Sequence, residues 1–459
     1  MDKTTETFAS YAANLAYEDL TPKAIHATKR CIVDALGCAF GAFDAAPIKA
    51  VRAMASKVSS TQPATLIGTR IKSSPELAGF VNGSMIRYLD FSDDYFGTSG
   101  KQSGPHPSDN IGSILAAAES VGADGKALIM GTALAYETCN QLVDGTLLHP
   151  NGWDYTIMHS VGTSLGAGKI LGLSREQLGN ALSLAVVANV SLWQTRLGEL
   201  SVWKGMAGPN GSRNGLFAAL LAKENITGPG EPFEGKAGFM KQLGSPFDLN
   251  HLGRKDLPFK IERTCYKYLP VMYSIQLPIW TALELRKQVD IDDIEAITVY
   301  LYAYTLSTDA YSPERWDPKT RESADHSGPY LIGAALVDGA ITEETMTPHR
   351  FRDPGILSVV KKIEVKEDKQ YSAAYPQALN CRFEARLKSG KVVSVHQANP
   401  KGHVANPLSD QELEGKFLKQ ACPLLGEKPA RALLERLWNL ETLDDVSKLL
   451  PLMVVPTGA

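Results

Sequence analysis

The longest uniform feature of the chain is an alanine-rich helical pattern that runs from about residue 5 to residue 225. Thr21 directly before Pro22 predicts a helix start, because threonine caps free backbone N–H groups and proline fits the first helical position. Ser174 followed three residues later by Gln177 predicts another start, as a capping box. Helices with so many small residues can pack closely, so the pattern favours a bundle of helices over a β-sandwich.

The pattern changes near residue 290, where the stretch 296–304 (AITVYLYAY) alternates apolar and polar residues with period two. That alternation predicts a half-buried β-strand. Three further stretches are predicted to be strands: 359–366, 379–387 and 391–397. A Ser389-Gly390 turn joins the last two. A helix is predicted over 323–339, and helical character returns from 409 onward.

A chain of 459 residues exceeds the roughly 250 to 300 residues that one hydrophobic core usually serves. We therefore expect two domains in a mainly α protein. Residues 1–265 and 405–459 are expected to form an all-helical domain, and residues 266–404 a smaller α+β domain.

Charge and cysteine spacing disfavour several classes of protein. The formal net charge is −3 and no Lys/Arg-rich run occurs, so neither a nucleic-acid nor a membrane partner is expected. The first twenty residues lack the apolar core of a secretory signal, which favours a cytosolic address. None of the six cysteines forms a Cys-x-x-Cys pair, so the sequence supports no zinc ribbon or iron–sulfur centre, and we expect no metal or other cofactor.

The stretch GPHPSDNIGS (104–113) places His106 between two prolines. Ser108 or Asp109 could be no more than the N-cap of the helix that follows. The prolines would also leave the imidazole with little conformational freedom to lose on binding a ligand.

Three acids, Asp90, Asp93 and Asp94, lie within five residues shortly before His106. Clustered carboxylates can bind a divalent metal, but a second acidic motif is missing. The simpler interpretation is a group of solvated acids in a turn.

Further candidates for acid–base chemistry lie in loops and at helix starts. They include an imidazole in HSVGTS, cations near tryptophan and aromatic residues, and the TRESADHSGPY stretch. Such groups suit an acid–base site for an anionic substrate. They are His159, Lys204, Arg213, Lys267, Arg321, His326 and Tyr330.

Several long stretches resemble the MmgE/PrpD family, and within it the 2-methylcitrate dehydratase-like branch. The similarity runs from about residue 30 to 415 and is carried by YLDFSDDY, GPHPSDNIGSILAAAE, AGKILGLSREQ, RNGLFAALLAKENITGPGEPFEGKAGFMKQ, WDPKTRESADHSGPY and KGHVANPLSD. It implies a large all-helical domain, a smaller α+β lid domain, a homodimer and a substrate site between the domains. The family's enzymes act on small polycarboxylates without a metal.

Position by position, the resemblance implies catalytic roles for the six residues Asp90, His106, His159, Lys204, Lys267 and Tyr330. Asp94, where relatives often carry threonine, Arg321, His326 and Arg213 are expected to contact the substrate. Ser274, also expected there, stands where this branch commonly has histidine, and Gly328 replaces a larger apolar residue. Both departures leave the substrate open.

The resemblance favours dehydration of a 2-methylcitrate-like acid through a carboxylate-stabilised carbanion. Lys204 and Lys267 would neutralise the developing charge, and His106 and His159 would act as base and acid in either order. Asp90 would orient one imidazole, and Tyr330 would donate to the leaving oxygen. The alternatives are a cis-aconitate-type decarboxylase, an iminodisuccinate-type epimerase and a dimeric binding protein without catalysis.

Overall fold

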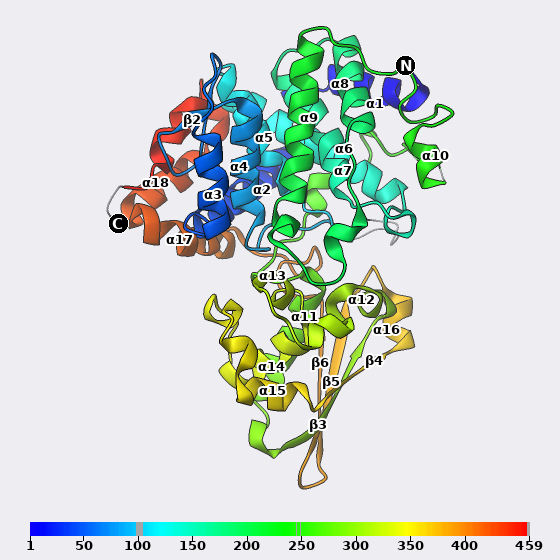
Figure 1. Ribbon diagram of the computed structural model, residues 1–459, viewed down its shortest axis with the longest axis vertical. Coiled ribbons are helices and arrows are strands. Elements are labelled where there is room, and N and C mark those ends of the chain that lie inside the picture. The colour runs from blue at the N-terminus through cyan, green and yellow to red at the C-terminus, as the bar shows by residue number, and fades with distance from the viewer. Residues whose placement is uncertain (98–103, 245, 248, 457–459) are drawn as a thin grey trace. The chain divides into compact units, whose positions relative to one another are not determined.

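The computed structural model describes residues 1–97, 104–244, 246–247 and 249–456 (Figure 1). By its internal contacts the chain divides into two compact units. The first contains residues 1–193, 205–266 and 408–459, and the second contains residues 194–204 and 267–407. The protein is mainly α-helical, with one small sheet in the second unit.

The first unit is built from helices. Their bounds are α1 Lys3–Asn14, α2 Pro22–Gly41, α3 Ala46–Ala55, α4 Pro75–Arg87, α5 Ile111–Ser120, α6 Gly125–Gly145, α7 Thr156–Ile170, α8 Arg175–Val187, α9 Ala207–Lys223, α10 Phe239–Leu243, α17 Asp410–Leu425 and α18 Glu427–Trp438. The predicted starts are confirmed, because the Thr21 side chain accepts from Ala24 N and Ser174 with Gln177 forms a capping box. A two-residue strand pair, β1 Ala64–Thr65 and β2 Lys72–Ser73, was not predicted.

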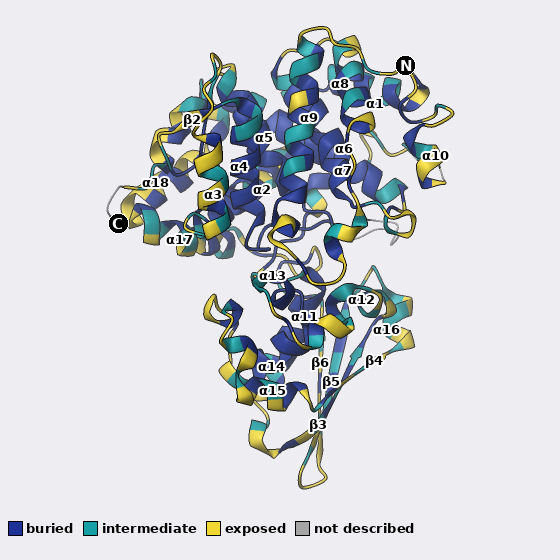
Figure 2. Cartoon of the chain, viewed as in Figure 1, coloured by how far each residue is buried: buried dark blue, intermediate teal, exposed yellow. Residues whose placement is uncertain are grey.

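Small residues bring the central helices of this unit into close contact. A Cβ on Gly211 of α9 would lie 2.3 Å from the Thr156 carbonyl oxygen of α7, and one on Gly215 would lie 2.4 Å from the Ser160 carbonyl oxygen. Helix α7 is buried over almost its whole length (Figure 2). The packing that the small residues predicted therefore places α7, with His159, at the centre of the unit.

The second unit contains a four-stranded sheet in the order β4-β3-β5-β6. Strand β3 (Ile294–Leu301) is parallel to β4 (Ile363–Glu367) and antiparallel to β5 (Asn380–Leu387), which pairs with β6 (Val392–Ala398). The helices of the unit are α11 Tyr273–Arg286, α12 Ala303–Ser307, α13 Arg321–Ala324, α14 Gly328–Asp338, α15 Pro354–Val360 and α16 Lys369–Ala374. Helix α11 packs on the sheet at β5 and β6, and this gives the unit its own core.

The structure corrects several predicted boundaries in this unit. The first strand ends at Leu301 and the chain continues into α12, and residues 359–360 complete α15 instead of starting β4. The helix predicted over 323–339 is broken between Ala324 and Gly328, and Asp325 and His326 lie in the break.

The segment 194–204, which the sequence analysis placed in the helical domain, groups with the second unit. Its Leu200 N–H donates to Ser323 Oγ at 3.2 Å, and Arg315 donates to the Gly198 carbonyl at 3.0 Å. These hydrogen bonds hold the segment on the second unit, so Lys204 belongs to that unit too.

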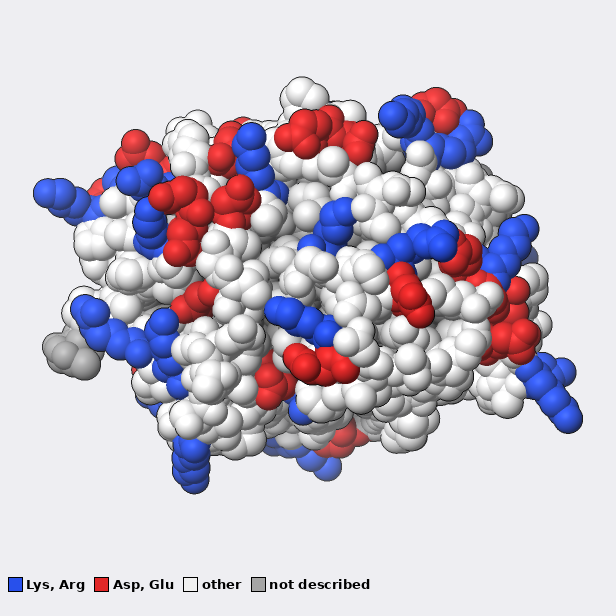
Figure 3. All heavy atoms as spheres, turned by 90° about the horizontal axis from the view of Figure 1, so that it is seen from above, with Lys and Arg blue, Asp and Glu red and all other residues white. Residues whose placement is uncertain are grey.

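No single helix among the described residues is long and apolar enough to cross a membrane. Helices α2 and α3 reach that length and apolar composition only when they are taken together, across a bend of 100°. The molecular face in Figure 3 carries basic and acidic side chains mixed together.

Candidate active site

Asp90 lies in the loop after α4 and is 1% exposed. Its φ of 53° places the backbone in the left-handed region, which costs about 1 kcal/mol or more for a residue other than glycine. Arg87, in the last turn of α4, forms a buried ion pair with its carboxylate. Nearby acids, Asp90 first among them, raise the pKa of Arg87 against the opposing effect of burial, so the guanidinium stays charged.

Asp93 connects this loop to α6 and to the segment that carries His106. Its Oδ2 accepts from the Tyr136 hydroxyl at 2.7 Å, and its Oδ1 accepts from the Ser108 N–H at 3.1 Å. Burial raises the pKa of Asp93 to about 6. Asp93 therefore fixes the position of two chain segments at once.

The acidic cluster is not a group of solvated turn residues, so that interpretation is wrong. Asp90, Asp93 and Asp94 are all buried, and the backbone of Asp94 pairs with that of Cys265 through two hydrogen bonds. Asp94 is expected to contact the substrate. None of these contacts tests that expectation, so it stays a prediction.

His106 precedes a short 3₁₀ turn, Pro107–Asn110, that leads into α5. Ser108 and Asp109 lie inside that turn, so the prediction that either caps a helix is wrong, and Asp93 holds the Ser108 N–H instead. The Nδ1 of His106 lies 2.6 Å from the Asp93 carbonyl oxygen, and its Nε2 lies 3.8 Å from Asp90 Oδ1. This arrangement fits the predicted pairing of Asp90 with an imidazole.

His159 lies in the first turn of α7 and is completely buried. Its Nε2 lies 3.5 Å from Asp109 Oδ2. The ring of Tyr155 contacts both imidazoles edge to face, with centroids 6.0 Å from His106 and 5.7 Å from His159. The structure thus brings the two predicted histidines into one cluster in the first unit.

Arg213 lies on α9 in the first unit and is half-buried. One of its terminal nitrogens donates to Asn214 Oδ1 at 2.6 Å, and no bond joins it to either histidine in the described part of the chain. Its role in binding substrate remains a prediction.

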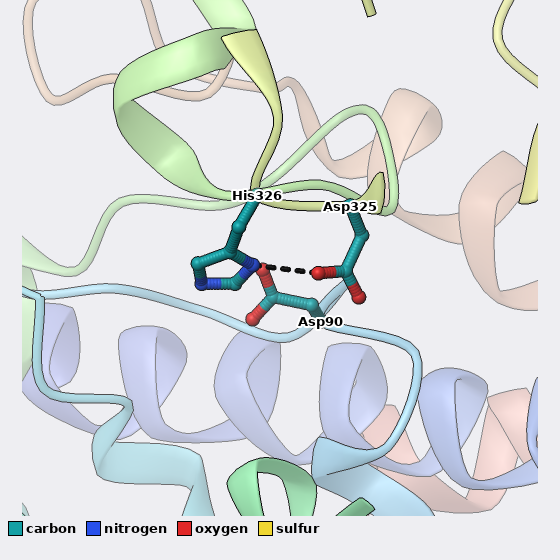
Figure 4. Close-up of side chains that lie close together, drawn as sticks. All are labelled: Asp90, Asp325 and His326. Carbon is teal, nitrogen blue, oxygen red and sulfur yellow. Dashed lines mark hydrogen bonds and ion pairs between the residues drawn. The ribbon is translucent and has the colours of Figure 1, made fainter. Parts of the chain in front are cut away.

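A second cluster lies within the second unit. Lys204 Nζ lies 2.8 Å from Asp325 Oδ1 and 3.2 Å from His326 Nδ1, and His326 Nδ1 lies 2.6 Å from the same carboxylate oxygen (Figure 4). Arg321 lies 3.4 Å from the other oxygen of Asp325. One buried carboxylate thus holds an ammonium, an imidazole and a guanidinium.

The remaining predicted residues of the second unit are buried but differ in surroundings. Lys267 is 1% exposed. Ser274, in the first turn of α11, has no hydrogen-bond partner for its buried hydroxyl among the described residues. The space at Gly328 is filled by Tyr311, since a Cβ there would lie 2.4 Å from the Tyr311 ring.

Tyr330 is not grouped with Lys204. Its hydroxyl donates to the Thr345 carbonyl at 2.6 Å, and its ring packs edge to face on Phe351. Burial raises its pKa. The proposed donation to a leaving oxygen would require this hydroxyl to exchange its partner.

The sequence analysis missed several residues of the two clusters: Arg87, Asp109, Asn110, Tyr155 and Asp325. Nδ2 of Asn110 lies 3.4 Å from Nδ1 of His159. Asp109 and Asn110 stand in PSDN and Asp325 stands beside His326, so adjacency to predicted histidines was the signal that could have found them. Arg87 carries no comparable local signal, because its role depends on the turn that brings it back to Asp90.

Comparisons with known proteins identify the family. Residues 6–252 match the MmgE/PrpD N-terminal domain, and residues 269–442 match the MmgE/PrpD C-terminal domain. The chain belongs to the MmgE/PrpD family. Among its relatives, cis-aconitate decarboxylase of Homo sapiens is 26% identical over 99% of this chain and 95% of its own length.

Other relatives carry a different activity in their names. The mitochondrial 2-methylcitrate dehydratase of Yarrowia lipolytica is 25% identical over 88% of this chain and 80% of its own length. The 2-methylcitrate dehydratase of Escherichia coli (strain K12) is 26% identical over 78% of this chain and 77% of its own. Membership of the family supports a lyase, and identities near 25% leave the substrate to be proposed.

Proposed function

We propose that this protein is a lyase that dehydrates a 2-methylcitrate-like polycarboxylate. The observation that carries the proposal is the cluster in which His106 and His159 share the ring of Tyr155 and each lies near a buried carboxylate. Imidazoles held in this way can exchange a proton with substrate near neutral pH. Family membership supports the choice of substrate class.

The reaction breaks a C–H bond next to a carboxylate and the neighbouring C–O bond, forms a C=C bond and releases water. A histidine takes the proton from carbon, and the departing hydroxyl takes up a proton. Negative charge accumulates on the carboxylate oxygens during this step, and fixed cations lower its energy. Lys204 and Lys267 are the proposed cations, with Arg321 and Arg213 as further carboxylate contacts.

Decarboxylation of cis-aconitate is the second candidate. The human decarboxylase aligns over 99% of this chain, against 78 to 88% for the two dehydratases described above. The same cations would stabilise the carbanion left after loss of carbon dioxide, and a protonated group would then quench it.

The test incubates the protein, after treatment with a chelator, with 2-methylcitrate and follows the ultraviolet absorbance of the new conjugated enoate. His106→Gln is expected to lower turnover by about two to four powers of ten, the usual size of a general acid–base contribution. Lys388→Gln, which alters an exposed residue of the second unit, is the control and should leave turnover unchanged.

Unchanged ultraviolet absorbance during incubation with 2-methylcitrate would contradict the dehydration proposal. Release of carbon dioxide from cis-aconitate would then establish the decarboxylase, and interconversion of iminodisuccinate enantiomers the epimerase. If all three assays fail while citrate raises the melting temperature, the binding-protein alternative is supported, since a ligand that binds only the folded state stabilises it.

We also propose a homodimer and a cytosolic location, both of which rest on the family resemblance and the sequence pattern. Sedimentation of the purified protein tests the first. A monomer at micromolar concentration would contradict it.

A further inference from the structure

The backbone of Asp90 is held in a conformation that residues other than glycine rarely adopt. Its φ of 53° lies in the left-handed region, where a Cβ atom crowds the following carbonyl oxygen. Such strain persists where the surrounding structure determines the conformation. The ion pair with Arg87 holds the carboxylate of Asp90. The contacts of the next residue, Phe91, show what holds the backbone.

A buried lysine contacts Phe91 in two ways. Lys416 Nζ donates to the Phe91 carbonyl oxygen at 2.7 Å, and the same ammonium lies 3.9 Å from the centroid of the Phe91 ring. It also donates to Asp34 Oδ1 of α2 at 2.6 Å. The Lys416 side chain is 6% exposed, so water competes little for these charge-assisted bonds. One ammonium thus fixes both the carbonyl and the ring of the residue that follows Asp90.

Close packing of α17 on α2 brings Lys416 to this loop from 325 residues away. Gly37 of α2 leaves room for Phe417 of α17, since a Cβ on Gly37 would lie 3.1 Å from the Phe417 Cα atom. Gly41 leaves room for Leu89, the residue before Asp90, since a Cβ on Gly41 would lie 2.8 Å from Leu89 Cδ1. Small residues of α2 therefore accommodate both the C-terminal helix and the loop.

Stability alone does not explain a lysine at this position. Lys416 and Asp34 form one buried ion pair of the first unit, and Arg87 and Asp90 form another. A buried ion pair is seldom a net source of stability, because the desolvation of both charges offsets their attraction. What an apolar side chain at residue 416 could not provide is the hydrogen bond to the Phe91 carbonyl.

We propose that Lys416 is a positioning residue, which holds the loop so that the carboxylate of Asp90 faces His106. Asp90 Oδ1 lies 3.8 Å from Nε2 of His106, and an opposite charge at this separation stabilises the imidazolium. Arg87 pairs with Asp90 and the ring of Tyr155 contacts His106, and both stay in place when residue 416 is changed. Helix α17 thus affects, through the backbone of one loop, how strongly His106 holds a proton. Its effect on turnover rests on the proposed function, whereas the placement of Asp90 does not.

NMR titration of the full protein with labelled histidine, between pH 4 and 10, tests this placement. The chain has nine histidines, and His106→Asn assigns the signal. Asp90→Asn is the reference variant: it removes the carboxylate, so the midpoint of the His106 titration should fall by about one pH unit or more, the usual effect of a close opposite charge. Lys416→Met should shift the midpoint in the same direction.

The sign of the shift distinguishes positioning from simple electrostatics. Lys416→Met removes a positive charge and takes the lysine away from the Asp34 carboxylate, and both changes favour the imidazolium. Electrostatics alone would therefore raise the midpoint of the His106 titration or leave it unchanged. A fall requires the Asp90 carboxylate to move away from His106.

Lys29→Met is the matched control. Lys29 of α2 donates to the Trp438 carbonyl at 2.8 Å and pairs with Glu441, so it too joins α2 to the C-terminal part of the chain, and none of its described bonds reaches the loop. It should lower the melting temperature but leave the His106 midpoint unchanged. Lys416→Met with Asp34→Asn removes both charges of the buried pair, which protects the fold, and should lower the midpoint as well.

If the His106 midpoint in the two Lys416 variants equals that of the wild type or lies above it, the inference is wrong, and an unshifted midpoint in Asp90→Asn would also overturn it. A crystal structure of Lys416→Met with Asp34→Asn gives a second measurement. We expect a negative φ at Asp90 and a longer distance to His106, and retention of both wild-type values would contradict the proposal. Neither readout depends on turnover, so failure of this inference is distinguishable from failure of the proposed lyase activity.

Discussion

The histidine cluster of the first unit and that of the second unit are built from different kinds of partner. Nδ1 of His106 faces a backbone carbonyl, and Nδ1 of His159 faces an amide and a thiol. Nδ1 of His326, in contrast, lies against the carboxylate of Asp325 and the ammonium of Lys204. Neutral groups therefore face Nδ1 of the first two rings, and charged groups face Nδ1 of the third.

This difference has a chemical consequence. A neutral donor or acceptor selects one tautomer by hydrogen bonding alone, so the proton remains in place when the charge of a substrate changes nearby. A ring inside a network of charges responds to every charge in it. In the proposed reaction, the first unit would place a proton, and the second would hold the negative charge of the polycarboxylate.

The largest effect is expected from breaking the charged cluster. Lys204→Met removes the ammonium closest to Asp325, both of them fully buried, and an uncompensated buried charge typically costs about 3 to 5 kcal/mol of stability. Arg321 still faces the other carboxylate oxygen, so the cost should fall toward the lower end. Urea unfolding followed by circular dichroism measures it.

The comparison is sharpened by two further variants. Lys204→Met with Asp325→Asn removes both charges and should recover most of the lost stability. Lys366→Met, which breaks an exposed pair with Glu364, should change stability little. If Lys204→Met and Lys366→Met lost equal stability, the buried ion pair of the second cluster would contribute no more to stability than an exposed ion pair does.

Local signals in the sequence predicted much of the fold. The Thr21 cap, the Ser174 capping box and the hairpin around Gly390 depend on neighbours within a few residues, and short-range patterns encode such features. The break at Asp325 was missed because residues 323–339 read as one helix. It depends instead on contacts such as the hydrogen bond from Met272 N–H to the Asp325 carbonyl.

The candidate site was predicted in its titrating groups but not in the groups that orient them. His106 and Lys204 were named from motifs and resemblance, whereas the Asn110 side chain is held by Thr163, which the folded chain brings near from 53 residues away. The burial of Asp93 likewise depends on α6, more than forty residues away, through Tyr136. Orientation by tertiary neighbours has no signature in a single sequence.

A smaller effect is expected from the pH dependence of stability, and it tests whether two buried acids of the first unit are protonated in the folded protein. Burial raises the pKa of Glu137 to about 7 from a usual value of 4.5. Between these values the folded state binds more protons than the unfolded state, so the free energy of unfolding falls as pH rises, by about 3 kcal/mol in total. Asp93, with a pKa of about 6, adds a similar decrease below pH 6.

Glu137→Gln keeps an oxygen that can accept from the Lys260 N–H but removes the titration. We expect the decrease in stability between pH 6 and 7 to flatten, as measured by denaturant unfolding at closely spaced pH values. Asp256→Asn, at an exposed acid, is the control. An unchanged slope in Glu137→Gln would mean that Glu137 is ionised in the folded protein.

The last prediction concerns the spacing around His159 and has the smallest expected effect. A Cβ on Gly208 of α9 would lie 1.8 Å from Asp109 Oδ2, so Gly208→Ala must displace that carboxylate from its place 3.5 Å from His159. A displacement of about 1 Å at a catalytic cluster can cost about 100-fold in turnover.

Gly415→Ala is the matched control, since this exposed helical glycine has nothing within 4 Å of the added methyl. This variant should gain up to about 1 kcal/mol in stability without loss of turnover. If Gly208→Ala keeps wild-type turnover, then the position of the His159 imidazole does not matter for the reaction. The proton-placing role of the first unit would in that case be carried by His106 alone.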